Sequence, residues 1–185
     1  VCDYTKFEKE DFYTLYKLDD ITAIVTEFDL DSDLKYKYSK YCKIINSVRG
    51  ERFMKILIGS DKYGVDLKEH LKSYLLSKGY QVVDKTEDSV DFVDSADRVC
   101  KGILEDEGDR AILIDAYGVG SFIAANKHKG IICAQVSDEH SAFMTRNHNN
   151  TSVITLGSKI LGQTLAENIV DSYLESEYAG GRHQI

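Results

Sequence analysis

The 185-residue sequence lacks any hydrophobic run long enough to cross a membrane, and residues 1–6 do not have the pattern of a signal peptide. Basic residues are few, because 23 Lys and Arg stand against 31 Asp and Glu, for a formal net charge of −8 at pH 7. This balance argues against nucleic acid as a partner of the whole surface and leaves room only for a local anion pocket. We therefore expect a cytoplasmic protein that binds neither a membrane nor nucleic acid.

Cysteine spacing typical of metal or disulfide sites is also missing. The four cysteines, Cys2, Cys42, Cys100 and Cys133, form no C-x-x-C or His-paired pattern. This argues against disulfides and against zinc. Cys133 lies within an apolar run, where buried packing is its expected role.

From Met54 onward, short apolar runs alternate with amphipathic stretches. Such alternation predicts an α/β domain over residues 54–185, a five-stranded parallel Rossmann-like sheet with helices on both faces. Its active site is expected at the carboxyl ends of the strands, beside the switch point in strand order. The predicted strands are residues 55–60, 81–84, 110–115, 130–136 and 152–156. The predicted helices are residues 65–77, 92–105, one from 119, one around 141, and 164–178.

Residues 1–53 have a different pattern. A helix end (12–18), a strand (21–26), a helix (31–41) and a short strand (42–46) predict an incomplete α/β fragment, too small to form its own core. Residues 19–27 (DDITAIVTE) and 35–38 (KYKY) resemble the carboxyl end of DeoR-type sugar-responsive repressors. We interpret the segment as a repressor-like remnant joined to a second domain. One hypothesis is a read-through or misplaced start, with Met54 as the natural first residue.

The most informative tract is residues 112–126, where an apolar strand ends in small residues that open a helix. Gly118 and Gly120 let a ligand approach the backbone, and the first N–H groups of the helix attract anions. A plain glycine-permitted turn is the simpler alternative. A dinucleotide fingerprint is disfavoured, because Ile123 stands where the third glycine is required.

Four motifs in order resemble one enzyme family: residues 54–61 (MKILIGSD), 115–126 (DAYGVGSFIAAN), 144–150 (MTRNHNN) and 180–184 (GGRHQ). They are similar to the ribose-5-phosphate isomerase type B and galactose-6-phosphate isomerase family. Within it, residues 114–122 resemble the A-type subunits of the galactose enzymes. The resemblance implies interconversion of galactose 6-phosphate and tagatose 6-phosphate through an enediolate, without metal or cofactor.

The resemblance also implies roles for the loop after residue 114. The ribose enzymes and the B subunits carry a catalytic cysteine there, in a Cys-Gly-Thr-Gly loop, whereas this chain has Asp115, Ala116, Tyr117 and Gly118. Asp115 is a candidate base if burial raises its pKa, and the alternative is a helix N-cap. Tyr117 replaces a small threonine and crowds the loop. The implied substrate contacts of this loop are Tyr117, Gly118, Gly120 and Ser121.

A second group of residues matches the family more closely. His148 corresponds to the ring-opening histidine, Asn149 to a substrate-binding amide, and Arg182 to a phosphate-binding arginine. Taken alone, residues 147–150 are more typical of a polar turn before a strand, and the alternative for Arg182 is a solvated tail. Arg146 is expected to be an exposed helical charge, and the alternative is a neighbour of the phosphate. The family's second arginine would follow Ile185, so we expect part of the phosphate clamp to be absent.

Asp61 matches an aspartate that contacts sugar hydroxyls, although Lys62 replaces the histidine that usually follows it. The half of the site that contains Asp61 and Asp115 thus lacks residues that the resemblance leads us to expect. The half that contains His148 retains the expected residues. The resemblance implies a pocket at a subunit interface, where this chain serves the cysteine loop of a B subunit in a hetero-oligomer. The alternatives are a self-sufficient isomerase that uses Asp115, a non-catalytic scaffold, and a sugar-phosphate-sensing regulator.

Overall fold

The computed structural model describes residues 23–26, 36–38, 40, 43–46, 54–86 and 91–181. The chain divides into two compact units, Val1–Arg52 and Phe53–Ile185. In the first unit, strand β1 (Ala23–Thr26) pairs in parallel with β2 (Lys43–Asn46), both within the predicted strand segments. The helix end expected at 12–18 and most of the helix expected at 31–41 lie outside the described residues.

The second unit contains a five-stranded, entirely parallel sheet in the order β4-β3-β5-β7-β6. This confirms the predicted fold class. Its strands are β3 (Lys55–Ser60), β4 (Gln81–Asp84), β5 (Arg110–Asp115), β6 (Cys133–Gln135) and β7 (Val153–Gly157). Three of them, β3, β4 and β5, have the predicted bounds, because their apolar residues form short runs between clear turn signals.

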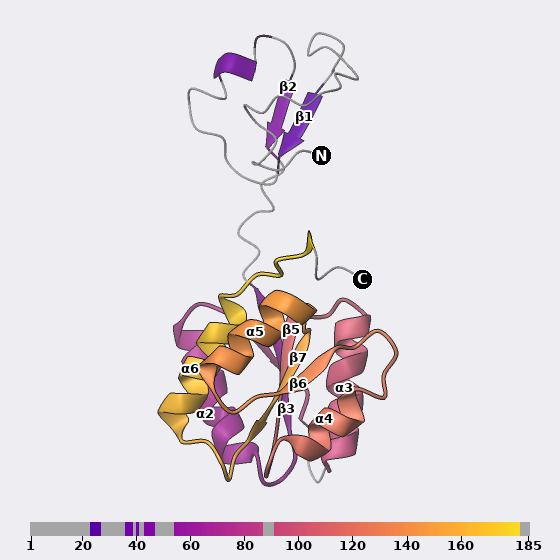
Figure 1. Cartoon of the computed structure of the whole chain (residues 1–185), viewed down its shortest axis with the longest axis vertical. Helices are drawn as coiled ribbons and strands as arrows, with labels where there is room; N and C mark the ends of the chain where they lie inside the picture. The colour runs from indigo at the N-terminus through magenta and orange to yellow at the C-terminus, as the bar shows by residue number, and fades with distance from the viewer. Residues whose placement is uncertain are drawn as a thin grey trace. The chain divides into compact units, whose positions relative to one another are not determined.

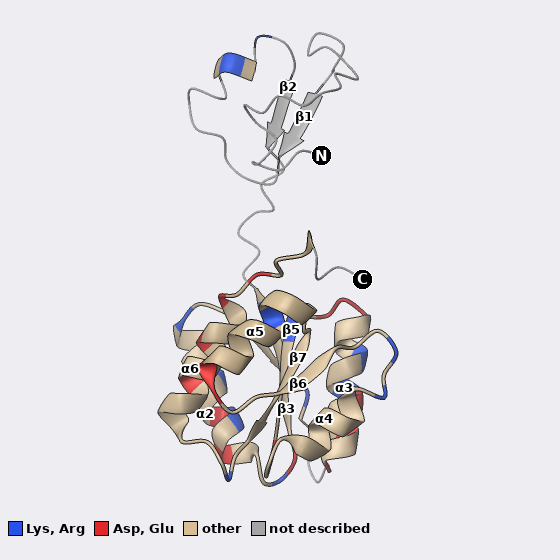
Figure 2. Cartoon of the chain, viewed as in Figure 1, with Lys and Arg blue, Asp and Glu red and all other residues tan. Residues whose placement is uncertain are grey.

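Helices cover both faces of this sheet (Figure 1). On one face lie α2 (Val65–Ser77), α5 (Glu139–Asn149) and α6 (Gln163–Leu174). The other face is covered by α3 (Phe92–Leu104) and α4 (Val119–Ala125). Among the described residues, no helix is both long and apolar enough to cross a membrane. Lys and Arg are interspersed with Asp and Glu over these helices (Figure 2).

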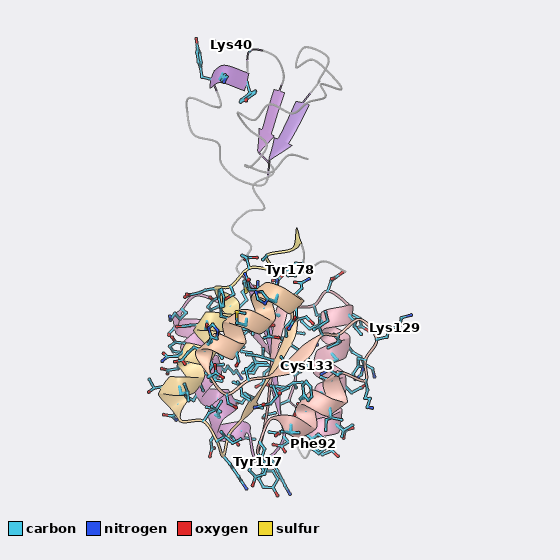
Figure 3. All side chains as sticks on the ribbon, in the orientation of Figure 1. Lys40, Phe92, Tyr117, Lys129, Cys133 and Tyr178 are labelled. Atoms are coloured by element: carbon cyan, nitrogen blue, oxygen red, sulfur yellow. The ribbon has the colours of Figure 1, made fainter. Side chains whose placement is uncertain are left out.

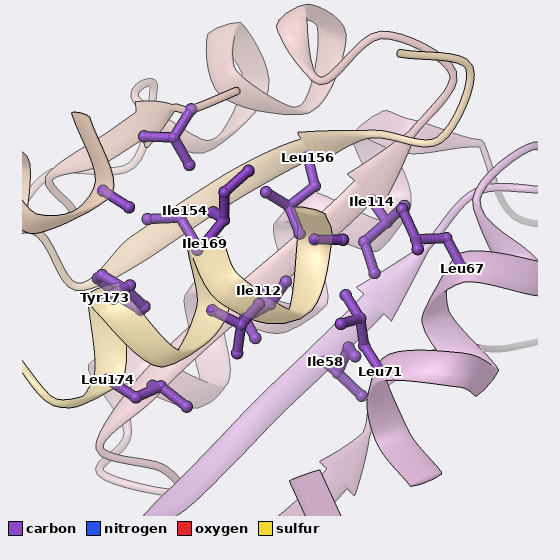
Figure 4. Packing of buried hydrophobic residues seen from close by; sticks show 14 of the residues in the cluster. Ile58, Leu67, Leu71, Ile112, Ile114, Ile154, Leu156, Ile169, Tyr173 and Leu174 are labelled. Carbon is purple, nitrogen blue, oxygen red and sulfur yellow. The ribbon is translucent and has the colours of Figure 1, made fainter. Parts of the chain in front are cut away.

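Successive strand residues alternate between two hydrophobic cores, since side chains along a strand point to opposite faces. Ile56 and Ile58 face α2 and α6, whereas Leu57 between them packs with α3. Figure 4 shows the first core, where Ile112 and Ile154 from neighbouring strands lie beside residues of α6. Both faces of the central strands are therefore shielded from solvent. For this reason the strands appear in the sequence as continuous apolar runs.

Two predicted elements are shorter than expected by three residues or more, and α3 ends at Leu104, one residue before its predicted end. The helix predicted to reach residue 178 ends at Leu174, because the buried guanidinium of Arg110 donates to the carbonyls of Tyr173 (2.8 Å) and Ser176 (2.9 Å). The strand predicted from residue 130 begins at Cys133. Its first residues form a turn in which the Ile131 N–H donates to the His128 carbonyl (3.1 Å).

The strand order places a switch point between β3 and β5. The chain leaves β3 toward β4 on one side and leaves β5 toward β6 on the other. In open α/β sheets, ligands bind at the carboxyl ends of the strands at such a point. The loops after β3 and β5, which carry Asp61 and Asp115, flank it.

Candidate active site

Three loops, which follow β3, β5 and β7, meet at the carboxyl edge of the sheet. Asp61 is buried, and its Oδ1 accepts hydrogen bonds from the N–H groups of Tyr63 (2.9 Å) and Gly64 (3.0 Å). The Asp61 N–H donates to the carbonyl of Ile114 (3.2 Å), which joins this loop to the end of β5. Gly64 permits the approach, because a Cβ there would lie 2.4 Å from the Ile114 carbonyl oxygen.

Asp115 is buried at the end of β5, and its carboxylate organises the next loop. Its Oδ1 accepts the N–H groups of Tyr117 (2.7 Å) and Gly118 (2.5 Å), and its Oδ2 accepts that of Ser121 (2.8 Å). Burial alone would raise the pKa of Asp115, but hydrogen bonds from the Ser121 side chain and these backbone groups outweigh it and lower the pKa below its ordinary value. A carboxylate base needs the opposite shift, so this geometry favours the capping role.

Tyr117 projects from the same loop at the carboxyl edge, where Figure 3 labels it near Phe92. Its side chain is 56% exposed, and Gly118 after it takes a left-handed conformation (φ 82°) that suits glycine. The ammonium group of Lys159 lies 4.7 Å from the ring centre of Tyr63 and 5.9 Å from that of Tyr117. Tyr63, Tyr117 and Lys159 therefore form an aromatic and cationic rim beside the loop.

Gly120 and Ser121 form the first turn of α4. A Cβ on Gly120 would lie 3.0 Å from the ring of Phe92, so glycine lets the start of α3 close over the loop. Ser121 is buried, and its N–H is already bonded to Asp115. The structure thus brings together the predicted residues of the loop after β5. Their polar groups largely form hydrogen bonds with one another.

Sequence reasoning missed Ser158, which ties all three loops together. Its hydroxyl donates to the carbonyl of Tyr63 (2.8 Å), and its N–H donates to the carbonyl of Asp115 (2.8 Å). A serine directly after a buried strand resembles any loop residue, so the sequence offered no signal for this role.

His148 and Asn149 lie in the last turn of α5 rather than in a loop. His148 is half-buried, and Asn149 is exposed. Arg146, expected to be exposed, is half-buried, and its Nη1 donates to the Thr151 carbonyl (3.2 Å) and bonds to Asn150. That expectation was wrong, because the chain turns back after α5 and gives the guanidinium backbone partners. Arg182 lies outside the described residues.

His148 and Asn149 lie at the amino end of the strands, opposite Asp61 and Asp115 at the carboxyl edge. Helix α5 ends at Asn149, before β7 begins at Val153, whereas Asp115 pairs with Gly157 at the far end of β7. At about 3.3 Å per residue, β7 alone separates them by roughly 13 Å. In Figure 3, Tyr117 accordingly lies at one end of the domain and Tyr178, whose neighbours contact α5, at the other.

Sequence comparison decides the family, since residues 56–185 match the one described as Ribose/Galactose Isomerase. The chain belongs to the ribose/galactose isomerase family. It is 55% identical over 133 residues to the galactose-6-phosphate isomerase subunit LacA of Clostridium acetobutylicum, covering 71% of this chain and 94% of that protein. It is 56% identical to the LacA subunit of Staphylococcus aureus, with the same coverage.

Solved structures of ribose 5-phosphate isomerases share the fold of the second unit. The ribose 5-phosphate isomerase of Thermotoga maritima superposes with a TM-score of 0.68 at 41% identity, covering 71% of this chain and 92% of that one. The ribose-5-phosphate isomerase B of Mycoplasma genitalium, solved with ribulose-5-phosphate, gives a TM-score of 0.65 at 36% identity, with 70% and 89% coverage.

Within the described part of this family member, no group of three or more His, Cys, Asp or Glu side chains could hold a metal ion. The cysteines described, Cys100 and Cys133, are buried, and burial raises the pKa of the Cys100 thiol to about 12 and that of Cys133 still further. Neither thiol lies in the loops at the carboxyl edge. The described residues therefore supply no thiolate base to either half of the site.

Proposed function

We propose that this chain is the A-type subunit of a heteromeric galactose-6-phosphate isomerase, which interconverts D-galactose 6-phosphate and D-tagatose 6-phosphate. The relatives named LacA are similar over nearly their whole length, which supports the substrate and the subunit type. The observation that carries the proposal is the separation of His148 from the Asp115 loop by the length of β7. One copy of the chain does not assemble both halves of a pocket.

In this proposal, the reaction moves a proton from C2 to C1 of the open-chain aldose and a hydroxyl proton from O2 to O1, so that the carbonyl shifts from C1 to C2. His148 opens the sugar ring by proton transfer, the Asn149 amide contacts the substrate, and Arg182 binds the phosphate through its planar guanidinium. The cysteine loop of a B subunit supplies the base that forms the enediolate. Its backbone N–H groups stabilise the developing oxyanion.

The loop half of this chain takes a structural role in the same proposal. Both oxygens of Asp115 accept backbone N–H groups, and its pKa is lowered rather than raised. Tyr117 occupies the rim of the loop with a large exposed ring. The shape of the loop then depends on Asp61, Gly118, Gly120 and Ser121.

Reconstitution tests the proposal directly. We expect the purified chain alone to give negligible conversion of galactose 6-phosphate, and activity to appear when a cysteine-containing B subunit is added. A B subunit with the loop cysteine changed to serine is the matched control and should remain inactive in the mixture. Robust turnover by this chain alone would contradict the shared site and would make Asp115 the catalytic base.

A further inference from the structure

Strands β4 and β6 form the two edges of the five-stranded sheet. The β4 edge carries charged side chains, because β4 ends at Asp84 and Lys85 follows it. Residues 131–136 (IICAQV), which contain β6, include no charged residue, no proline and no glycine. Uncharged edge strands of this composition tend to pair with another chain, and charged side chains are a common protection against such pairing. The β6 edge lacks this protection.

Asn126, the C-cap residue of α4, covers the backbone of this edge at Cys133, which Figure 3 labels on β6. The Oδ1 atom of Asn126 accepts the N–H of Cys133 (3.1 Å), and its Nδ2 donates to the carbonyl of the same residue (3.1 Å). A residue in an opposing antiparallel strand would make the same pair of bonds. The Asn126 side chain therefore stands in for a neighbouring strand.

The orientation of β6 places these bonds on its outer side. The Ile132 carbonyl accepts an N–H group of β7 (3.3 Å), and the Val136 N–H donates to a carbonyl of β7 (3.2 Å). Backbone groups alternate in direction along a strand, so those of Cys133 and Gln135 point away from β7. An added strand would bond to these two residues, and Asn126 already occupies the first of them.

Asn126 is itself held by α4. Its Nδ2 also donates to the carbonyl of Phe122 (3.0 Å), and its backbone N–H donates to the same carbonyl (3.2 Å). Phe122 is one of the last four residues of α4, whose carbonyls have no partner within the helix. One side chain thus closes both the end of α4 and the edge of the sheet.

We propose that Asn126 is an edge cap, whose side chain prevents β6 from pairing with β6 of a second copy of this chain. A second copy fits this edge because two identical segments related by a two-fold axis pair antiparallel, with Cys133 of each opposite Gln135 of the other. Ile132, which directly precedes β6 and is 47% exposed, adds apolar surface to the same contact. This role requires neither substrate nor a B subunit.

The test uses Asn126→Ala in the full chain, which removes both bonds to Cys133. In dilute protein, we expect hydrogen exchange of the Cys133 amide to accelerate roughly five- to tenfold, the equivalent of one lost hydrogen bond. At rising concentration, sedimentation should show a mass twice that of wild type. Asn168→Ala is the matched control, because it removes an exposed amide that bonds Glu139 (3.2 Å) on the opposite face of the sheet. Both properties should keep their wild-type values in this control.

A charge placed on the edge separates strand pairing from unfolding. Adding Ile132→Lys to Asn126→Ala should restore the wild-type mass, because an edge lysine opposes strand pairing, while exchange of the Cys133 amide stays fast. In the associated form of Asn126→Ala, the Gln135 amide should become protected from exchange. The amide of Ile112, in the central strand β5, should keep its wild-type protection.

Four results would overturn the edge cap. The first two are a wild-type mass for Asn126→Ala at every concentration and an unchanged exchange rate of the Cys133 amide. The third is association that Ile132→Lys does not suppress, which would place the contact elsewhere on the surface. The fourth is association with loss of protection at Ile112, which would show that unfolded chains associate.

Discussion

Asp115 has the burial expected of a catalytic carboxylate but the hydrogen bonding of a structural one. Three backbone N–H groups, from Tyr117, Gly118 and Ser121, converge on its two oxygens. These donors stabilise the charged form more than burial destabilises it, so the pKa falls. The hydrogen bonds of Asp115 therefore stabilise the conformation of its loop.

Asp115→Asn tests this role. We expect the free energy of unfolding to fall by about 1–3 kcal/mol at pH 7, because charge-assisted hydrogen bonds to a buried carboxylate are lost. A lowered folded-state pKa stabilises the fold at pH values above the ordinary pKa of about 4, and that stability is lost as pH falls through the folded-state pKa. The difference from wild type, measured by urea denaturation, should therefore shrink below pH 4.

Exposed Asp66→Asn serves as the control and should change the free energy of unfolding by less than about 0.5 kcal/mol. A difference between Asp115→Asn and wild type that stays constant between pH 7 and pH 3 would contradict the role assigned to the Asp115 carboxylate.

In the proposed enzyme, His148 is the residue of this chain that transfers a proton to open the sugar ring. His148→Asn in the assembled complex should lower kcat by about a hundredfold or more, the usual loss for a general acid–base group. Assembly, measured by sedimentation, should remain normal. A substrate analogue held in the open-chain form should react at a rate much closer to wild type. Unchanged turnover of the ring form would show that the subunit is a scaffold.

At the scale of elements, close packing of loops holds the carboxyl edge in shape. Gly64, the N-cap of α2, brings the loop after β3 against the end of β5, and Gly157 lets the end of β7 pack on the Tyr117 backbone, which a Cβ would meet at 2.8–2.9 Å. The hydroxyl of Ser158 adds a hydrogen bond across the same loops. These approaches leave no space for side chains.

Gly64→Ala should therefore lower the free energy of unfolding by about 1–3 kcal/mol, because the new Cβ forces the loop away from the Ile114 carbonyl. Gly162→Ala is the matched control. Gly162 is the N-cap of α6 and has no atom within 4 Å of an added Cβ, so both variants share the modest cost of alanine at an N-cap. Equal destabilisation of the two variants in thermal unfolding would contradict the steric explanation.

At the scale of the whole molecule, the second unit contains every residue that the family match covers. The match spans residues 56–185, and the unit boundary lies between Arg52 and Phe53. Both hydrophobic cores are formed by residues of the second unit. A unit with its own core is expected to fold by itself.

A chain that starts at Met54 should therefore retain the thermal midpoint of the second unit and full activity with a B subunit. Calorimetry and reconstitution with the full-length chain as control measure both properties. A lower midpoint or lost activity would show that residues 1–53 support the isomerase unit, against their interpretation as a repressor-like remnant.

Much of the fold was predictable because its signals are local. The bounds of β3, α2, β4 and β5 follow from apolar periodicity and turn residues within each segment. The family motifs likewise show that the loop cysteine is missing and predict that His148 opens the sugar ring, a role that stays a prediction. Whether Asp61, Asn149 and Arg182 contact substrate stays a prediction.

The tertiary structure decided the features that depend on contacts between distant residues. The end of α6 is set by Arg110, more than 60 residues earlier, and the segment after it is held by Asn147 across 30 residues. The lowered pKa of Asp115 depends on how its loop folds back onto its carboxylate. Periodicity reports the environment of one segment, so the sequence alone determined which elements form, and packing between them determined where His148 and Asp115 lie.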